Sequence, residues 1–489
     1  MEAGWARMND LIIIQASQGL CAYVLRSVPE ASARGVVVGH DHRHNSKRWA
    51  SLTAQVFISN NVKVYLHRGL VHTPLVPFSV KKLNAACGVM ITASHNPKDD
   101  NGYKVYWENA VQIIAPHDVG IAESILQNLE PRIGNMPDVY TSPLCVDCSD
   151  SVKESYFMLI QGLVTTELAH SSAKFVNTSM HGVSDPFVSE AFKQAGFAPC
   201  ISVEKQRLPD PEFPTVKFPN PEEKGALDLA LSEATTSRAN YVLAQDPDAD
   251  RFTAAERGAD GLWFLFTGDQ LGALFASHVL SKYKATGKPL GKLAMIASTV
   301  SSRMIEAMAR VEGFKFVDCL TGFKFIGNTA LDLEAAGYEV PFGYEEAIGF
   351  MFGSEIRDKD GVAATVMFAE LVAEVQRRGL TVHGYLDELY RRYGYFETKN
   401  SYFVCSDPVT IDRIFWGIRH FQESDSIIRY PTSVASLTVN SVIDLTAGYE
   451  YDSTNAPSYQ PRLPLSSGNM VQFRAQSTND PDIKIVLTV

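Results

Sequence analysis

The sequence predicts an α/β protein in which helices alternate with the strands of largely parallel sheets. Short apolar runs recur at 35–39, 85–91 and 239–244, and each is typical of a buried strand. Segments with the helical spacing of apolar residues lie between such runs, which indicates strand–helix–strand units. Polar residues follow the strands, at the edge of the sheet where open α/β proteins place their chemistry.

Length, composition and charge exclude several classes of protein. The 489 residues are expected to form three or four domains, at roughly one domain per 150 residues. The net charge of −11 argues against a general nucleic-acid binder but permits a small phosphorylated substrate. Seven scattered cysteines, an odd number, favour a reducing compartment over a disulfide scaffold. Neither a signal peptide nor a membrane-length apolar run is found, so we expect a cytoplasmic protein without a membrane partner.

The N-terminal part of the chain is predicted to begin with a helix. Asn9 can cap a helix that starts at Asp10, because its side chain can accept a hydrogen bond from a free backbone N–H group. A Pro-, Ser- and Asp-rich stretch, 131–150, is predicted to be a linker. The elements expected between them include a strand at 35–39, a helix at about 49–59, and strands at 62–66 and 85–91.

The pattern of strand, loop and helix then recurs in two further units. In the second, Pro209–Pro221 is predicted to be a long exposed loop, and a helix at about 268–280 closes the unit. A third unit starts near Lys288, and a smaller segment of short strands and turns starts near Tyr402. The remaining expected elements are strands from 175, at 239–244, at 314–320 and at 338–342, and an amphipathic helix after 361.

Ser94 is the candidate nucleophile. It lies in the loop 92–97, directly after the predicted strand at 85–91. A serine that takes part in phosphoryl transfer needs a cation on the phosphoryl oxygens, hydrogen-bond donors and a proton acceptor. His95, Lys104 and Lys359 are candidates for the acceptor or for charge stabilisation. A serine in a loop is more often a turn former, so the prediction depends on the combination.

Three alternating aspartates form the candidate metal site. Asp246, Asp248 and Asp250 face the same way in extended chain, so their carboxylates converge and repel one another. A hard divalent cation relieves that repulsion, and ligation by oxygen alone favours Mg²⁺. A calcium loop of the EF-hand type is excluded because Arg251 and Arg257 stand where it needs Gly and Glu. The alternative is a solvated acidic turn, which the preceding buried strand disfavours.

Two further strand ends carry polar groups of interest. Glu345 and Glu346 suit sugar hydroxyl groups better than phosphate, because they are themselves anionic; a solvent-exposed turn is the alternative. Gly361 leads into a helix whose free N–H groups favour an anion. Thr178 and His181 are interpreted as structural residues of a strand-end turn.

Four ordered segments resemble the active-site loops of the α-D-phosphohexomutase superfamily. They are 92–97, 246–251, 343–350 and 357–361. Residues 94–104, the run 321–324 and the Glu-Glu-Ala-Ile-Gly loop are similar to the phosphoglucomutase-2/phosphopentomutase branch. The resemblance implies three α/β domains with mixed sheets and a smaller C-terminal α+β domain, like the TATA-binding protein, around a central cleft. The predicted domains are 1–150, 151–285, 286–400 and 401–489.

The resemblance also implies an activity and a set of site residues. The activity is the interconversion of 1- and 5-phosphates of ribose or deoxyribose, and of 1- and 6-phosphates of glucose. It proceeds through a phosphoserine and a sugar bisphosphate, glucose 1,6-bisphosphate or ribose 1,5-bisphosphate, which also acts as activator. The enzyme is expected to be a monomer. The implied roles are catalysis by Ser94, His95, Lys104 and Lys359; Mg²⁺ binding by Ser94, Asp246, Asp248 and Asp250; substrate binding by Arg43, Arg251, Thr321, Gly322, Lys324 and Glu345; and phosphate binding by Arg474, Ser477, Thr478 and Asn479.

The chain departs from the family pattern in three places. It starts at the helix that follows the family's first strand and its Gly-Thr-x-Gly-Leu-Arg turn, so we expect an N-terminally incomplete first domain. The segment 473–481 replaces the usual Arg-Thr-Ser-Gly-Thr-Glu-Pro phosphate loop and lacks its glycine, and the closing helix of the family is missing. Ala347 stands where hexose mutases carry Ser, as in the phosphopentomutase branch.

Three alternative functions stay open at the level of sequence. A glucose-1,6-bisphosphate synthase with an acyl phosphate donor would use the same loops. The shortened ends also suit a sugar-phosphate-binding protein without activity. A Mg²⁺-dependent phosphatase fits less well, since the aspartates do not form the D-x-D-x-T pattern of a nucleophile.

Overall fold

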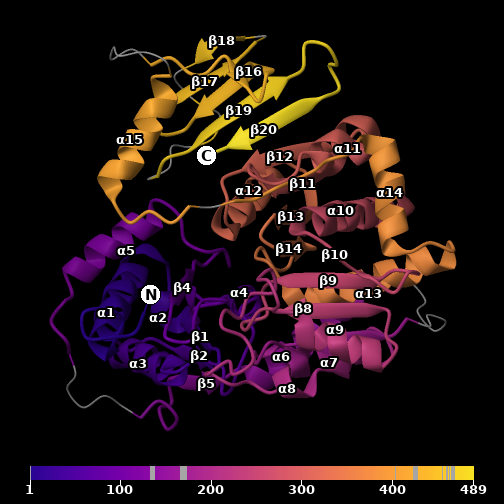
Figure 1. Ribbon diagram of the computed structural model, residues 1–489. Helices are drawn as coiled ribbons and strands as arrows, with labels where there is room; N and C mark the ends of the chain where they lie inside the picture. The colour runs from indigo at the N-terminus through magenta and orange to yellow at the C-terminus, as the bar shows by residue number, and fades with distance from the viewer. Residues whose placement is uncertain are drawn as a thin grey trace. The chain divides into compact units, whose positions relative to one another are not determined.

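The computed structural model describes residues 2–132, 138–165, 173–401, 403–421, 428–453, 455–458, 461, 463 and 468–489. The chain divides into two compact units, Met1–Glu397 and Thr398–Val489. The first unit contains three sheets with helices around them, which confirms the predicted α/β class (Figure 1).

The first sheet has five strands in the order β4-β3-β1-β2-β5. Strand β4 is antiparallel to β3, whereas the other neighbours are parallel, so the sheet is mixed as predicted. Its strands are β1 (Val36–His40), β2 (Val64–Leu66), β3 (Cys87–Ile91), β4 (Tyr103–Tyr106) and β5 (Cys145–Asp147). Its helices are α1 (Asp10–Ser27), α2 (Ala31–Arg34), α3 (Ser46–Ser59), α4 (Leu75–Leu83) and α5 (His117–Leu126).

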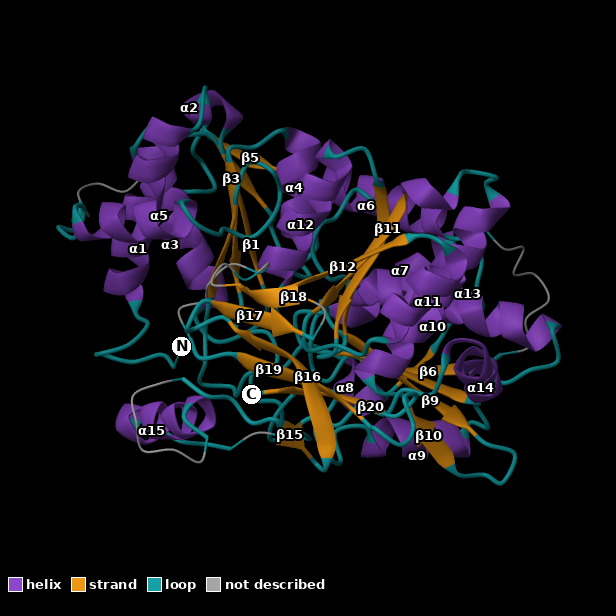
Figure 2. Cartoon of the chain, turned by 90° about the horizontal axis from the view of Figure 1, so that it is seen from above, coloured by secondary structure: helices purple, strands orange, loops and turns teal. Residues whose placement is uncertain are grey.

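Helices cover both faces of this sheet. Alternate residues of a strand point to opposite faces, and Val36 and Val38 pack with α1 and α3 while Val37 packs with α4. Figure 2 shows α1, α3 and α5 on one side of β1 and β3, and α4 on the other. Helix α1 begins where the sequence predicts, because the Asn9 side chain accepts a hydrogen bond from the Ile12 N–H. A strand buried on both faces explains the run of valines in β1.

The second sheet has the order β10-β9-β8-β6-β7. Strands β6, β7 and β8 are parallel, and β9 and β10 continue the sheet in antiparallel pairing. Its strands are β6 (Phe175–Thr178), β7 (Ile201–Ser202), β8 (Tyr241–Gln245), β9 (Phe252–Arg257) and β10 (Trp263–Leu265). The helices of this region are α6 (Ser149–Leu163), α7 (Ser184–Gln194), α8 (Glu204–Arg207) and α9 (Asp228–Thr236).

The third sheet has the order β12-β11-β13-β14, with β14 antiparallel to β13. Its strands are β11 (Leu293–Ser298), β12 (Lys315–Cys319), β13 (Glu339–Glu345) and β14 (Gly349–Phe352). The helices of this region are α10 (Gly268–Ala285), α11 (Met304–Glu312), α12 (Phe323–Ala335), α13 (Gly361–Arg377) and α14 (Val382–Tyr393), with a short 3₁₀ turn at Leu290–Lys292.

Helix α13 joins the second and third sheets. It contacts α6, α7, β8 and β9 of the second region as well as β14 and α10 of the third, and nearly all of its residues are buried (Figure 1). One apolar core therefore runs through all three sheets and includes Val37, Phe175 and Phe342. Loops from different sheets are held in fixed positions as a result, because a close-packed core does not deform continuously.

The structure differs from the sequence prediction in several elements. Strand β5 and the start of α6 lie within the stretch 131–150 that is predicted to be a linker. Strand β11 is missing from the prediction. Helix α10, predicted to close the segment 151–285, packs on β13. The stretch Pro209–Pro221 is not exposed throughout, because the Phe213 side chain is 3% exposed. Proline-rich composition predicts a loop correctly but says nothing about what the loop packs against.

The second unit is a small α+β structure. Its sheet has the order β18-β17-β16-β19-β20, and β15 also pairs with β16. Phe415 and Ile418 of the helix pack with Val442 and Phe473 of the sheet. The elements are α15 (Pro408–Arg419), β15 (Ser433–Val434), β16 (Leu437–Asp444), β17 (Tyr449–Asp452), β18 (Asn455–Ser458), β19 (Val471–Gln476) and β20 (Lys484–Thr488).

None of the helices formed by the described residues combines the length and the apolar character that crossing a membrane requires.

Candidate active site

The loop after β3 holds Ser94 in a strained backbone conformation. Ser94 has a φ of 53°, in the left-handed region that non-glycine residues seldom adopt. The Ser94 N–H donates to the Thr92 hydroxyl over 2.9 Å, which stabilises this turn. Ala249 and Ile348, in the aspartate loop and the loop after β13, have φ values of 53° and 50°. Strain of this kind is typical of functional sites, and each of these three loops contains it.

Arg43, which follows β1, supports the serine loop, here residues 92–102 between β3 and β4. Its guanidinium donates to the carbonyl oxygens of Ser94, Asn96, Pro97 and Asp100 over 2.5–3.3 Å. The side chain is completely buried and also lies 3.5 Å from Asp41. The sequence predicts that Arg43 binds substrate, but an enclosed guanidinium that is occupied by the loop cannot reach a sugar. The arrangement instead indicates that Arg43 positions the loop.

Ser94 meets the aspartate cluster across two different sheets. The Ser94 Oγ donates to Asp246 Oδ2 over 2.8 Å, although the two residues are 152 positions apart. Asp246, Asp248 and Asp250 are fully buried, and their nearest oxygens all lie within 4.8 Å of one another. The structure therefore brings together the hydroxyl group and the three carboxylates that the sequence predicts as partners.

The aspartates have the unsatisfied oxygens that a cation would need. Asp248 Oδ1 and Asp250 Oδ1 are buried and accept no hydrogen bond from any described residue. A buried carboxylate oxygen without a partner is costly, and a hard cation would satisfy it. Burial, and to a smaller extent repulsion from the other two aspartates, raises the pKa of Asp246 well above its usual range. Residues Asp246, Asp248 and Asp250, with Ser94 beside them, thus fit a divalent metal ion.

Two lysines partly compensate the negative charge, and a threonine donates a hydrogen bond to the cluster. Lys104 Nζ lies 2.8 Å from Asp248 Oδ2 and 2.9 Å from Asp250 Oδ2, and Lys359 Nζ lies 2.8 Å from Asp250 Oδ2. Burial alone would raise the pKa of Asp248, but the Lys104 charge and the hydrogen bonds from Lys104 and Thr73 lower it. Burial likewise opposes the charge of both lysines, yet the neighbouring aspartates raise their pKa values. Both lysines are therefore held as cations beside the aspartates.

His95 is the neutral partner of Ser94. Its Nδ1 lies 3.3 Å from Ser94 Oγ. Burial, and to a smaller extent the Arg251 charge, lowers the pKa of His95 to about 4. The imidazole is therefore uncharged near pH 7.

Residues of the third sheet complete the site. A Cβ atom on Gly349 would lie 2.9 Å from Lys359 Cδ and 3.1 Å from Glu345 Cγ, so both side chains converge on this glycine. Glu345 is 5% exposed, and burial raises its pKa despite the nearby Lys359 and Arg251. Arg251 donates its backbone N–H to Asp246 and its guanidinium to the Ala347 carbonyl, each over 2.9 Å. The aspartate loop and the loop after β13 are thus linked directly.

The start of α13 does not offer the free N–H groups that the sequence predicts. Asp360 caps the helix, and its carboxylate accepts hydrogen bonds from the N–H groups of Val362 and Ala363, each over 2.9 Å. Tyr156 from α6 also donates to this carboxylate. An internal anion therefore occupies this helix end, and the predicted anion site at Gly361 is wrong.

The remaining predicted substrate residues lie at the start of α12 and in the second unit. Thr321 is exposed, Gly322 is the N-cap of α12, and the Lys324 ammonium lies 4.9 Å from the centre of the Phe325 ring. In the second unit, the Arg474 guanidinium donates to Gln472 Oε1, and Ser477 Oγ accepts from two backbone N–H groups of the turn that contains Asn479. Their roles, and that of the exposed Thr478, stay predictions.

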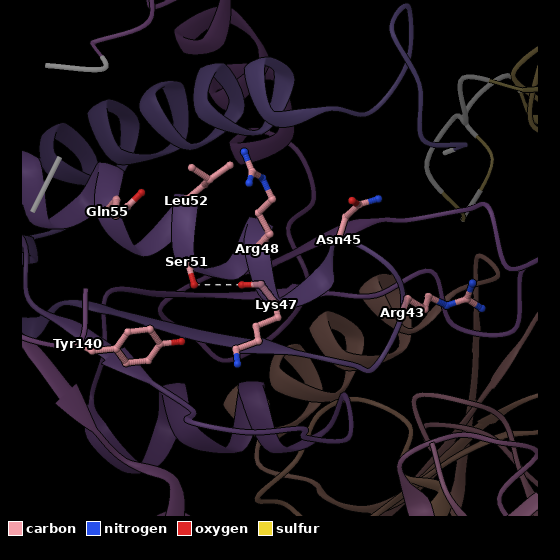
Figure 3. A pocket seen from close by; sticks show the side chains of 8 residues that line it. All are labelled: Arg43, Asn45, Lys47, Arg48, Ser51, Leu52, Gln55 and Tyr140. Carbon is pink, nitrogen blue, oxygen red and sulfur yellow. Dashed lines mark hydrogen bonds between the residues drawn. The ribbon is translucent and has the colours of Figure 1, made fainter. Parts of the chain in front are cut away.

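A cavity of about 620 Å³ borders the site region without containing Ser94 (Figure 3). It lies along α3, and Arg43 is the one predicted site residue in its lining. Figure 3 shows the Arg43 side chain pointing away from Lys47, Ser51 and Tyr140. The lining residues are Arg43, Asn45, Lys47, Arg48, Ser51, Leu52, Gln55 and Tyr140. This cavity is therefore distinct from the space around Ser94 and the aspartates.

Two residues of the site are missing from the sequence prediction. Thr73 donates to Asp248 Oδ2 over 2.5 Å from the loop before α4. Tyr106 donates to Asp358, whose carboxylate lies beside Lys359. The sequence offers one weak signal for Thr73, a Thr-Pro pair that follows a strand.

Comparison with known proteins identifies the family. Residues 1–132, 154–259 and 267–393 match the α/β/α domains I, II and III of phosphoglucomutase/phosphomannomutase. The chain belongs to this family, within the α-D-phosphohexomutase superfamily. The predicted resemblance to the superfamily, based on four short segments, and to its phosphoglucomutase-2/phosphopentomutase branch is confirmed.

Curated relatives match nearly the whole chain. A probable phosphoribomutase of Schizosaccharomyces pombe is 44% identical, with 99% of this chain and 84% of that protein covered. Human phosphopentomutase is 42% identical, with 97% and 79% covered. Human glucose 1,6-bisphosphate synthase is also 42% identical, with 98% and 78% covered.

Solved structures support the fold. Parafusin, a phosphoglucomutase from Paramecium, superposes with a TM-score of 0.68 at 18% identity and covers 96% of this chain and 83% of its own. A putative phosphomannomutase of Thermus thermophilus gives a TM-score of 0.67 at 22% identity, with 79% and 80% covered.

Proposed function

We propose that the protein is a Mg²⁺-dependent phosphosugar mutase of the phosphopentomutase type. Its substrates in this proposal are the 1- and 5-phosphates of ribose or deoxyribose and the 1- and 6-phosphates of glucose. The names of the curated relatives support the reaction class. The observation that carries the proposal is the 2.8 Å contact between the Ser94 hydroxyl and Asp246 inside a buried cluster of acids.

Ser94 is the phosphoryl carrier in this proposal. The phosphoserine donates its phosphoryl group to a free sugar hydroxyl, so that the bond from phosphorus to Ser94 Oγ breaks and a bond to the sugar oxygen forms. The hydroxyl proton passes to Ser94 Oγ, and the neutral His95 imidazole at 3.3 Å is placed to carry it. The resulting sugar bisphosphate reverses its orientation in the site and returns its other phosphoryl group to Ser94.

Asp246, Asp248 and Asp250 would hold Mg²⁺ together with the phosphate on Ser94. A bound Mg²⁺ would supply positive charge for the oxygens of the transferred phosphoryl group. Lys104 and Lys359 add cationic charge at the same place, since both contact Asp250. Burial of the cluster strengthens these interactions and limits hydrolysis by water.

Glu345 binds sugar hydroxyls in this proposal, and Arg251, Thr321, Gly322 and Lys324 complete the substrate set. Arg474, Ser477, Thr478 and Asn479 bind phosphate in this proposal. We also propose that the enzyme is a cytoplasmic monomer and that a sugar bisphosphate primes it.

The test is a priming experiment on the purified chain. Incubation with glucose 1,6-bisphosphate and Mg²⁺ should place phosphate on Ser94, which mass spectrometry of the peptide detects. The primed protein should then convert ribose 1-phosphate to ribose 5-phosphate. Unmodified Ser94 together with no isomerisation would overturn the proposal. Binding of sugar phosphate without turnover would instead support the non-catalytic alternative, and net release of phosphate would support a phosphatase.

A second candidate is a glucose 1,6-bisphosphate synthase. The supporting observation is the 42% identity to human glucose 1,6-bisphosphate synthase, which equals the identity to human phosphopentomutase. An acyl phosphate donor offered with glucose 1-phosphate separates the two functions. Formation of bisphosphate that depends on the donor, with negligible isomerisation, would favour the synthase.

A further inference from the structure

We propose that the loop 209–221, between α8 and α9 in the region of the second sheet, is a latch. It positions the serine loop, which belongs to the region of the first sheet. This inference deepens the proposed function and rests on it for its catalytic consequence. Two residues form the latch, Phe213 and Glu212. Both contact the first region, and neither belongs to the segments that resemble the superfamily's active-site loops.

A strained turn directs Phe213 into its contact. Phe213 has a φ of 46°, which is an outlier for a bulky residue. Asp210 holds the turn, because its side chain accepts a hydrogen bond from the Glu212 N–H and its carbonyl accepts one from the Phe213 N–H. The His181 carbonyl in turn accepts a hydrogen bond from the Asp210 N–H over 2.9 Å. Phe213 is 3% exposed, so burial of its ring offsets the cost of this conformation.

The Phe213 ring packs against Arg43. The guanidinium carbon lies 5.1 Å from the ring centroid, within the range of a cation–π contact, and His42 packs edge-on against the same ring at 5.3 Å. The same guanidinium donates to four carbonyl oxygens of the serine loop, including that of Ser94 over 2.6 Å. Phe213 therefore fixes the position of Arg43, and Arg43 fixes the serine loop.

Glu212 makes a second, weaker attachment. Its carboxylate lies 2.6 Å from Lys98 Nζ and 2.7 Å from His44 Nε2. Lys98 belongs to the serine loop, and His44 follows Arg43. All three side chains are about half exposed, and ion pairs of this kind contribute little. The buried Phe213 contact should therefore dominate.

The latch would add to the shared core in holding two essential groups that come from different sheets. Ser94 follows β3 of the first sheet, whereas Asp246 follows β8 of the second. A displacement of about 1 Å between reacting groups can cost a hundredfold in rate. A contact that spans both sheets beside Ser94 holds the 2.8 Å spacing between Ser94 and Asp246.

Hydrogen exchange of the full chain tests the latch independently of activity. Phe213→Leu keeps an apolar side chain but removes the ring face, Phe213→Tyr retains the ring, and Glu212→Gln weakens the ion pairs. Phe218→Leu is the matched control, because Phe218 lies on the same loop and is 52% exposed. We expect exchange at residues 94–100 to rise about tenfold in Phe213→Leu, as loss of a buried cation–π contact predicts. Glu212→Gln should show a smaller rise, and Phe213→Tyr and Phe218→Leu should match the wild type.

Kinetics of the primed enzyme provide the second readout. In Phe213→Leu, kcat should fall about tenfold while KM for the sugar phosphate stays within about twofold, because binding groups are retained.

Unchanged exchange at 94–100 in both Phe213→Leu and Glu212→Gln would overturn the latch. Faster exchange with unchanged kcat would overturn its role in the reaction. If Phe213→Leu loses protection throughout, Glu212→Gln decides: a rise confined to 94–100 supports the latch, and no rise overturns it. A wild type that is neither primed nor active would refute the proposed function, yet the exchange experiment would still decide the latch.

Discussion

Two buried clusters of charged side chains in the first unit differ in how completely each satisfies its own charges. The cluster at Ser94 combines Asp246, Asp248 and Asp250 with Lys104 and Lys359 and leaves two carboxylate oxygens without a hydrogen bond from a described residue. The second cluster joins α10 and α13. In it, His278 lies 2.8 Å from Glu370 and 3.0 Å from Glu374, and Lys282 lies 2.6 Å from Glu370.

The difference separates a binding site from a structural ion cluster. In the second cluster two acidic groups face two basic groups, and Glu370 also accepts from the Thr165 N–H, so the end of α6 is tied to α13. Such a balanced set of acidic and basic groups has little remaining capacity for a cation, and removal of one partner is costly. The aspartate cluster has an excess of acid, which is costly in the empty protein and favourable once a cation arrives. Uncompensated negative charge in a buried cluster, more than burial itself, therefore indicates a binding site in this protein.

The largest effect is expected from Ser94→Ala. Loss of the phosphoryl carrier should lower isomerisation more than about a thousandfold. The free energy of unfolding should change by only about 1 kcal/mol, since the substitution removes the part-buried hydrogen bonds of one hydroxyl, to Asp246 and His95. Steady-state assays and chemical denaturation check both values. An active Ser94→Ala protein would show that the first cluster has another function.

Asp248→Asn should lower activity by about a hundredfold and remove the response to Mg²⁺. In the wild type, Mg²⁺ at about 100 times its dissociation constant should add about 2.7 kcal/mol of stability. The variant should melt at the same temperature with and without Mg²⁺, because one negative charge of the cluster is gone. Glu374→Gln is the control, and its melting temperature should still rise with Mg²⁺. Equal responses in both variants would place the metal elsewhere.

Glu370→Gln should have the opposite profile. Removal of one partner from a buried ion cluster should cost about 3 kcal/mol of unfolding free energy. The activity per folded molecule and the increase in melting temperature with Mg²⁺ should be retained. Urea denaturation followed by circular dichroism measures the loss, and assays below the transition measure activity. A loss of activity in a fully folded variant would show that the second cluster also contributes to the reaction.

The smallest effect is a dependence of stability on pH. Burial lowers the pKa of His278, but Glu370 and Glu374 outweigh burial and raise it above the usual 6.5, against a smaller opposing effect of Lys282. The folded protein therefore keeps a proton that the unfolded chain releases. This stabilisation is complete below about pH 6.5 and is lost as the pH rises through the higher pKa of the folded state. Thermal melts from pH 6 to pH 9 should show a decline that His278→Asn lacks; parallel curves would show that His278 titrates normally.

Local sequence predicted the individual groups of the site better than their partners. The hydroxyl of Ser94 and the three aspartates each lie in a short pattern after a strand, so their chemistry is visible in a few residues. Thr73 gives only a weak signal and Phe213 gives none, and the position of Arg43 after a strand does not reveal its partners. Those partners lie 175, 170 and 51–57 positions away, respectively. Local sequence also led to a wrong prediction at Gly361. A helix start there predicts an anion site, but the carboxylate of the preceding Asp360 already accepts the hydrogen bonds.

The sequence by itself determined the α/β class, the order of the site loops and the residue types available for chemistry, because periodicity and turn residues act over short distances. Tertiary structure decided which of those residues meet. Only the packing of β3, β8 and β13 around a shared core places Ser94 on Asp246, turns Arg43 from a substrate contact into a support, and brings Phe213 against it. Contacts between distant segments depend on how whole elements pack, and no short window of residues contains that information.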